Sequence, residues 1–76
     1  MIDPNEFDVT LRRLTRGPKF LPFVVELEDG SRIVVPHPGV AFGGGGASFI
    51  DPDDGIVDFT HEQVKAFRTF DQEVGV

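Results

Sequence analysis

One segment of this sequence constrains the fold more than any other, residues 22–36, which read PFVVELEDGSRIVVP. Proline closes both ends, and Asp29-Gly30 in the middle is typical of a hairpin turn. If these two residues alone formed the loop, charged side chains would lie opposite apolar ones on both faces of the hairpin. A three-residue loop, Glu28 to Gly30 with Gly30 in the left-handed conformation, instead leaves one face apolar throughout.

The three-residue loop therefore predicts one register for this hairpin. Its cross-strand pairs are Phe23 with Val35, Val25 with Ile33, and Glu26 with Arg32. A hairpin with one apolar face is not stable alone in water, so the rest of the chain is expected to cover that face.

The composition limits what else the chain can use for stability. At 76 residues it is expected to be a single domain, residues 1–76, with a small core and no disulfides or thiolate-bound metal, because it has no cysteine. Eight phenylalanines, from Phe7 to Phe70, must supply much of that core. The first residues, MIDPNEFD, do not resemble a signal peptide, and no apolar run reaches membrane-spanning length, so a cytoplasmic location is expected.

The charges are unevenly distributed along the chain. Thirteen acidic against seven basic residues give a net charge of −6, which opposes binding to phosphate backbones. The early basic residues form the candidate interaction surface of the chain, and the simplest alternative is an ordinary solvated surface. This surface comprises Arg12, Arg13, Arg16 and Lys19. The late acidic residues are Asp51, Asp53, Asp54, Asp58, Glu62, Asp71 and Glu73.

The segment that begins at Asp3 predicts an N-terminal helix. Asp3 suits the N-cap, Pro4 the first helical position and Glu6 the place of a capping-box partner. Residues 17–18, Gly-Pro, are expected to end the helix. Its narrow apolar stripe has three members at helical spacing, namely Phe7, Leu11 and Leu14.

After the first hairpin, the proline-rich residues 36–39 should end the second strand, and residues 40–42 are expected to return briefly to the sheet. The run from Gly43 to Gly46 predicts a mobile loop or a sharp reversal. A second hairpin should follow around residues 51–55. Its predicted pairs are Phe49 with Val57 and Ala47 with Phe59, with Ser48 and Asp58 on the opposite face.

The end of the chain is ambiguous from its pattern. Residues 60–67 begin like a capped helix, whereas Val64 to Phe70 could form a last strand. We expect a helical turn over residues 60–63, then a strand, and a frayed tail over residues 71–76.

No motif in the sequence meets the requirements of a catalytic or cofactor site. The glycine run is not followed by the Lys and Ser/Thr of a phosphate loop, and the acids of residues 51–55 do not fit a calcium loop in spacing. His37 and His61 lack a second ligand at metal-binding spacing, and neither Ser31 nor Ser48 has the context of a nucleophile. The sequence therefore predicts no catalytic residues, no cofactor and no metal, and an enzyme is not expected.

The order of the motifs is more informative than any one of them. FLPF at residues 20–23, a strand-DG-strand unit, VPHP at residues 35–38 and DPDD at residues 51–54 together resemble a family of short uncharacterised bacterial proteins abundant in planctomycetes. The likeness covers roughly Leu11 to Arg68. It implies a small β-rich barrel or curled sheet, similar to Sm-like or Src-homology-like barrels, and it implies no activity. The chain departs from the family pattern at residues 43–46, where relatives tend to have fewer glycines.

These observations predict an α+β fold, with the N-terminal helix packed on a small bent antiparallel sheet or partly open barrel of four to five strands. The expected function is a non-catalytic protein-interaction module that binds a protein partner through an open sheet edge or through the basic rim of the helix. The alternative is an Sm-like barrel for RNA or single-stranded nucleic acid, in which the candidate surface binds phosphates and an exposed phenylalanine stacks on a base. The net charge of −6 counts against that alternative.

Overall fold

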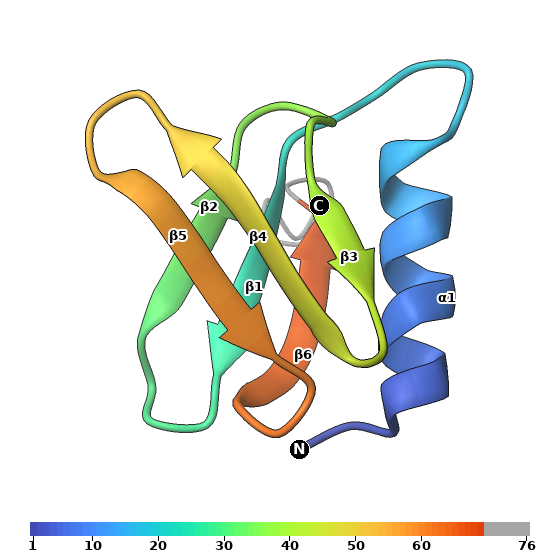
Figure 1. Ribbon diagram of the computed structural model, residues 1–76, viewed down its shortest axis with the longest axis vertical. Helices are drawn as coiled ribbons and strands as arrows, with labels where there is room; N and C mark the ends of the chain where they lie inside the picture. Colours follow the sequence, from blue (N-terminus) through green and yellow to red (C-terminus); the bar gives the residue numbers. More distant parts are fainter. Residues whose placement is uncertain (70–76) are drawn as a thin grey trace, which may run out of the picture.

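The computed structural model describes residues 1–69, and the predicted tail lies outside the described residues (Figure 1). One helix and six strands follow one another in the order α1 (Pro4–Thr15), β1 (Phe23–Leu27), β2 (Arg32–Val35), β3 (Ala41–Gly43), β4 (Gly46–Asp51), β5 (Gly55–Thr60) and β6 (Val64–Thr69). They form two antiparallel three-stranded sheets, a first sheet with the order β2-β1-β6 and a second sheet with the order β3-β4-β5. Figure 1 shows the second sheet in front of the first, with α1 along one side of both.

The predicted α+β class, with an N-terminal helix on antiparallel strands, is confirmed. Residues 1–69 form six strands, one more than the largest number expected, and the expected brief return of residues 40–42 is the short β3, which pairs with β4. They form two open sheets that do not close into a barrel. The chain passes from the first sheet to the second after β2, where the prolines of residues 36–39 cannot donate to a ladder, and returns to the first sheet after β5.

The predicted register of the first hairpin is confirmed. Phe23 pairs with Val35, Val25 with Ile33, and Glu26 with Arg32. Gly30 has a φ of 91°, the left-handed conformation that the three-residue loop requires. The turn is further held by the Asp29 carboxylate, which accepts hydrogen bonds from the backbone N–H and the hydroxyl of Ser31 at 2.8 and 2.5 Å.

The second predicted hairpin and the sharp reversal at the glycine run are also confirmed. Phe49 pairs with Val57 and Ala47 with Phe59. Gly44 and Gly45 have φ values of 63° and 85° and form a two-residue turn between β3 and β4. Two consecutive positive φ values favour glycine at both positions, which explains the two central glycines of the run.

The start of α1 and the turn before β6 follow local capping rules. The Asp3 carboxylate caps α1 by accepting from the N–H groups of Asn5 and Glu6, at 2.9 and 3.1 Å. Between β5 and β6, the Gln63 side chain accepts from the N–H of Thr60 at 2.9 Å, as in a capped helical turn. The predicted turn over residues 60–63 and the strand after it are therefore confirmed for the described residues.

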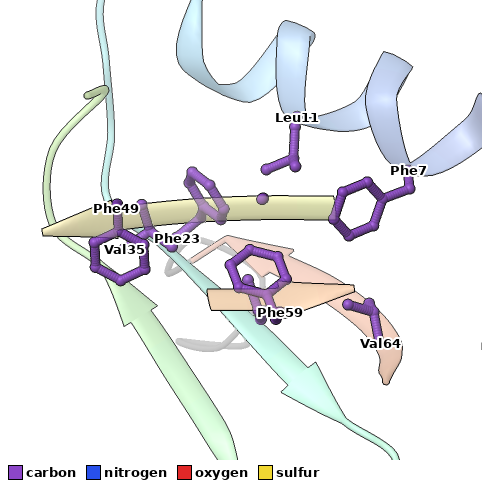
Figure 2. Close-up of a cluster of buried hydrophobic side chains, with 9 residues drawn as sticks. Phe7, Leu11, Phe23, Val35, Phe49, Phe59 and Val64 are labelled. Atoms are coloured by element: carbon purple, nitrogen blue, oxygen red, sulfur yellow. The ribbon is translucent and has the colours of Figure 1, made fainter. Parts of the chain in front are cut away.

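The core lies between the two sheets and the inner face of α1 (Figure 2). Phe7 of α1 is fully buried, with its ring centroid 5.7 Å from that of Phe59 on the second sheet and 5.9 Å from that of Phe67 on the first. Since one helical side chain contacts both sheets, α1 fixes their relative position. The buried core cluster is Phe7, Leu11, Phe23, Val25, Val35, Ala47, Phe49, Phe59 and Val64.

Candidate functional site

A groove of about 360 Å³ runs between α1 and β6. Its helix wall comes from successive turns of α1, with Thr10 and Leu14 among its residues, and its strand wall is formed by the consecutive residues 65–69. The ring contact between Phe7 and Phe67 joins the helix to the strand here. The groove thus follows the length of β6 rather than a single point on it.

β6 is an edge strand of the first sheet. Among the described strands it pairs only with β1, on one side. An edge strand offers unpaired backbone N–H and C=O groups to any extended segment that comes alongside. Because five consecutive residues of β6 line the groove, a segment that entered it would lie against this edge.

The groove is basic although the protein is acidic. Arg13 from the helix and Lys65 and Arg68 from the strand line it, against one acid, Glu6. The three bases are exposed, and Arg68 also forms an ion pair with Glu26 on β1 at 3.4 Å. Two walls that carry positive charge favour a ligand with carboxylates.

On its other side, α1 is fastened to the β3–β4 turn by a polar clamp that sequence reasoning missed. The Asp8 carboxylate accepts from the N–H groups of Gly44 and Gly45, at 3.0 and 3.1 Å. Gly45 has no room for a side chain, because a Cβ there would lie 2.7 Å from His61 Cδ2 and 3.0 Å from Pro4 Cβ. This clamp consists of Asp8, Gly44 and Gly45.

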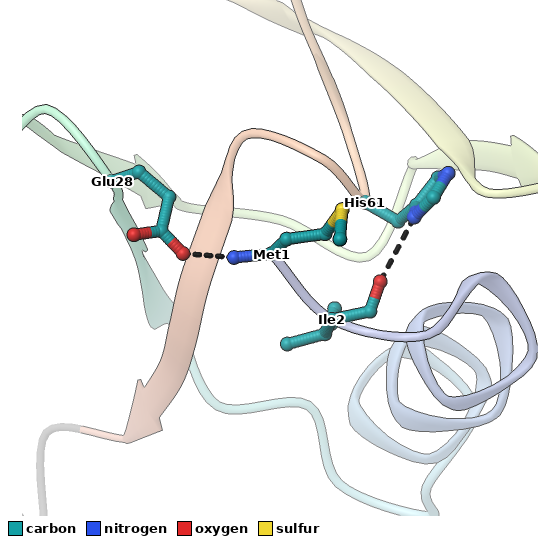
Figure 3. A network of polar contacts seen from close by, with 4 residues as sticks. All are labelled: Met1, Ile2, Glu28 and His61. Atoms are coloured by element: carbon teal, nitrogen blue, oxygen red, sulfur yellow. Dashed lines mark hydrogen bonds and ion pairs between the residues drawn. The ribbon is translucent and has the colours of Figure 1, made fainter.

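The N-terminal segment is also held in place (Figure 3). The Met1 ammonium group pairs with Glu28, and the N–H of Ile2 donates to the His61 carbonyl at 3.0 Å. His61 Nδ1 lies 2.8 Å from the carbonyl oxygen of Ile2, and since that oxygen can only accept, Nδ1 carries the proton. Ile2, which lines the groove, is thereby fixed beside it.

Both histidines are occupied by backbone partners. His37 Nδ1 accepts from the N–H of Gly39 at 3.1 Å, so Nε2 carries the proton and donates to the carbonyl of Ile50 at 2.8 Å. The acids of the β4–β5 turn likewise serve the turn, because Asp51 accepts from the N–H groups of Asp53 and Asp54, at 2.8 and 3.1 Å. Within residues 1–69, no cluster of three or more histidines, cysteines or acids could hold a metal ion.

Only one of the four residues of the candidate interaction surface belongs to the groove. Arg12, Arg13, Arg16 and Lys19 are all exposed, but only Arg13 lines the groove. Its partners there, Lys65 and Arg68, were not predicted, because nothing local in the pattern of residues 64–69 indicates that β6 lies beside α1. No phenylalanine of residues 1–69 is exposed, so the stacking residue of the nucleic-acid alternative has not been found among them.

Comparison with known proteins gives no assignment. No protein-family model, no curated protein and no solved structure matches the chain. The resemblance to planctomycete-type proteins therefore stays a prediction. In the described part of the chain, no helix is long and apolar enough to cross a membrane.

Proposed function

We propose that the protein is a non-catalytic interaction module that binds an extended, acidic segment of a partner protein in the groove between α1 and β6. One observation supports the proposal above all: the basic groove runs along an edge strand of the first sheet. The edge strand can pair with an extended backbone, and the basic side chains of the groove attract carboxylates.

In this proposal the partner adds a strand to the first sheet. Its backbone bonds to the edge of β6, which gives affinity without regard to sequence. Selectivity then comes from the side chains on the two walls, with Arg13 on the helix and Lys65 on the strand facing acidic residues of the ligand. Leu14 and Phe67, both half-buried, offer apolar surface to the residues in between.

The experiment uses a fluorescently labelled short peptide of alternating valine and glutamate as probe, with binding followed by anisotropy. Arg13→Glu and Lys65→Glu are each expected to weaken binding about tenfold or more, because each places a like charge beside the ligand. Arg16→Glu is the control, since this exposed arginine is the C-cap of α1 and does not line the groove. It should change the affinity less than about twofold.

Two further probes separate the alternatives. A valine–lysine peptide of the same length should bind far more weakly than the valine–glutamate peptide. Equal effects of Arg13→Glu and Arg16→Glu would contradict the groove, because they would show a response to net charge alone. Single-stranded RNA that binds at low salt more tightly than the acidic peptide, and loses binding in Arg12→Glu and Arg16→Glu, would favour the nucleic-acid alternative instead.

A further inference from the structure

The outer face of the second sheet has an apolar projection at one end. Ile50 and Ile56 lie directly opposite each other on β4 and β5, with 68% and 77% of their surfaces exposed. Their neighbours along the strands, Phe49 and Val57, face the core instead. Figure 1 shows this sheet nearest the viewer, with no other described element in front of it.

The other end of the same face is hollow. A shallow depression of about 520 Å³ is lined by residues of all three strands, among them Gly43, Gly46, Ser48, Asp58 and Thr60. A Cβ on Gly43 or on Gly46 would find no atom within 4 Å. The floor at these two positions is therefore bare backbone open to solvent, although neither glycine has the positive φ that would require glycine.

We infer that this face binds a second copy of itself, with the isoleucine pair of each copy in the depression of the other. The register supplies the geometry: Ser48 on β4 is two residues from Ile50 in one direction and two from Gly46 in the other. On β5, Asp58 is likewise two residues from Ile56 and two residues from Thr60. A two-fold axis that lies in the plane of the face and crosses the strands at Ser48 and Asp58 therefore places Ile50 over Gly46 and Ile56 over Thr60.

The same geometry determines how strong the dimer is and how it responds to salt. Three short strands offer less than the ~800 Å² per partner of a standard interface, so a dissociation constant on the order of 10⁻⁴ M is expected. The two Asp58 carboxylates approach each other at the axis and repel. Screening by salt should thus strengthen the dimer, the opposite of its effect on an acidic peptide in the basic groove.

The test is sedimentation equilibrium of the full chain over a concentration series, at low and high salt. The wild-type protein is expected to associate with rising concentration, and more so at high salt. Gly46→Val should fill the depression and reduce association at least about tenfold, while the melting temperature stays the same or rises, because the position is open and a β-branched residue suits a strand. The double variant I50S/I56S should lose association as well.

Two variants complete the design. Asp58→Asn removes the repulsion at the axis and should strengthen the dimer severalfold at low salt. Val34→Ser, a change at a half-exposed valine of the first sheet, should leave association unchanged. A folded Gly46→Val that associates like the wild type, or a wild type that stays monomeric at millimolar concentration and high salt, would overturn the inference. Neither result would affect the proposed peptide groove, which lies between α1 and β6.

Discussion

On its β3 side, helix α1 is fastened to the second sheet by the polar clamp of Asp8, Gly44 and Gly45, with no space for even one methyl group at Gly45. On its β6 side, the helix meets the first sheet through the rings of Phe7 and Phe67, beside an open groove of about 360 Å³. The contact on the β3 side is made by directional hydrogen bonds and is tightly packed. The contact on the β6 side is made by apolar rings and leaves space for a ligand beside it.

This difference explains how a short helix can form one wall of a binding groove. The clamp fixes the position of α1 on one side, so the width of the groove on the other side is set before any ligand arrives. A groove that is already formed loses less conformational entropy on binding. The following changes test this view of the helix, from the largest expected effect to the smallest.

Phe7→Ala should have the largest effect, because this side chain packs the helix against both sheets. It is fully buried and packs against Phe59 of the second sheet and Phe67 of the first. The free energy of unfolding, measured by urea denaturation, should fall by about 3–5 kcal/mol. Val9→Ala is the control on the same helix; Val9 is 49% exposed, and the change should stay within about 0.5 kcal/mol.

Gly45→Ala should come next. A Cβ at this position would lie 2.7 Å from the His61 ring, and the φ of 85° is unfavourable for alanine. A loss of about 2 kcal/mol or more is expected from strain and overpacking together. Gly44→Ala isolates the backbone contribution, because its φ is also positive but a Cβ there meets nothing; it should cost about 1 kcal/mol. Equal losses in the two variants would contradict the tight contact on the β3 side.

Asp8→Ala should cost less, because the exposed N–H of Gly44 can bond to water once the carboxylate is gone. A loss of about 1 kcal/mol is expected. The informative readout is affinity for the valine–glutamate peptide, which should fall severalfold although Asp8 does not line the groove. Asp8→Asn keeps one acceptor oxygen and should lie between the wild type and Asp8→Ala. Unchanged affinity in both variants would contradict the claim that the clamp sets the width of the groove.

The smallest effect is expected in the β1–β2 turn, which touches neither side of the helix. Hydrogen bonds from the Ser31 hydroxyl, and then from its backbone N–H, lower the pKa of Asp29 below its ordinary value of 3.8. Because the folded-state pKa is the lower one, this stabilisation is complete above the ordinary value and is lost as the pH falls through the folded-state pKa. The wild type should therefore melt slightly above Asp29→Asn at neutral pH, and the gap should close in acid. A gap independent of pH would contradict this account of the turn.

Local features of the fold could be predicted from the sequence, whereas contacts between distant segments could not. The register of the first hairpin follows from alternation around Gly30, and the N-cap from the short segment at Asp3. Asp8 is 36 residues from Gly44, and no local pattern signals that the two meet. The division of the strands into two sheets was missed for a related reason. Strands with the same alternation of apolar and polar residues can pair in either sheet. The groove was missed with it, because its basic walls come from opposite ends of the chain.

The central claim is that an acidic segment adds to the edge of β6, and hydrogen exchange followed by NMR tests it most directly. With the valine–glutamate peptide bound, backbone N–H groups within residues 65–69 that exchange fast in the unbound protein should become protected, and cross-strand contacts to the peptide should appear along β6. Peptide binding that shifts the signals of Arg12, Arg16 and Lys19 while exchange in residues 65–69 stays unchanged would contradict the account.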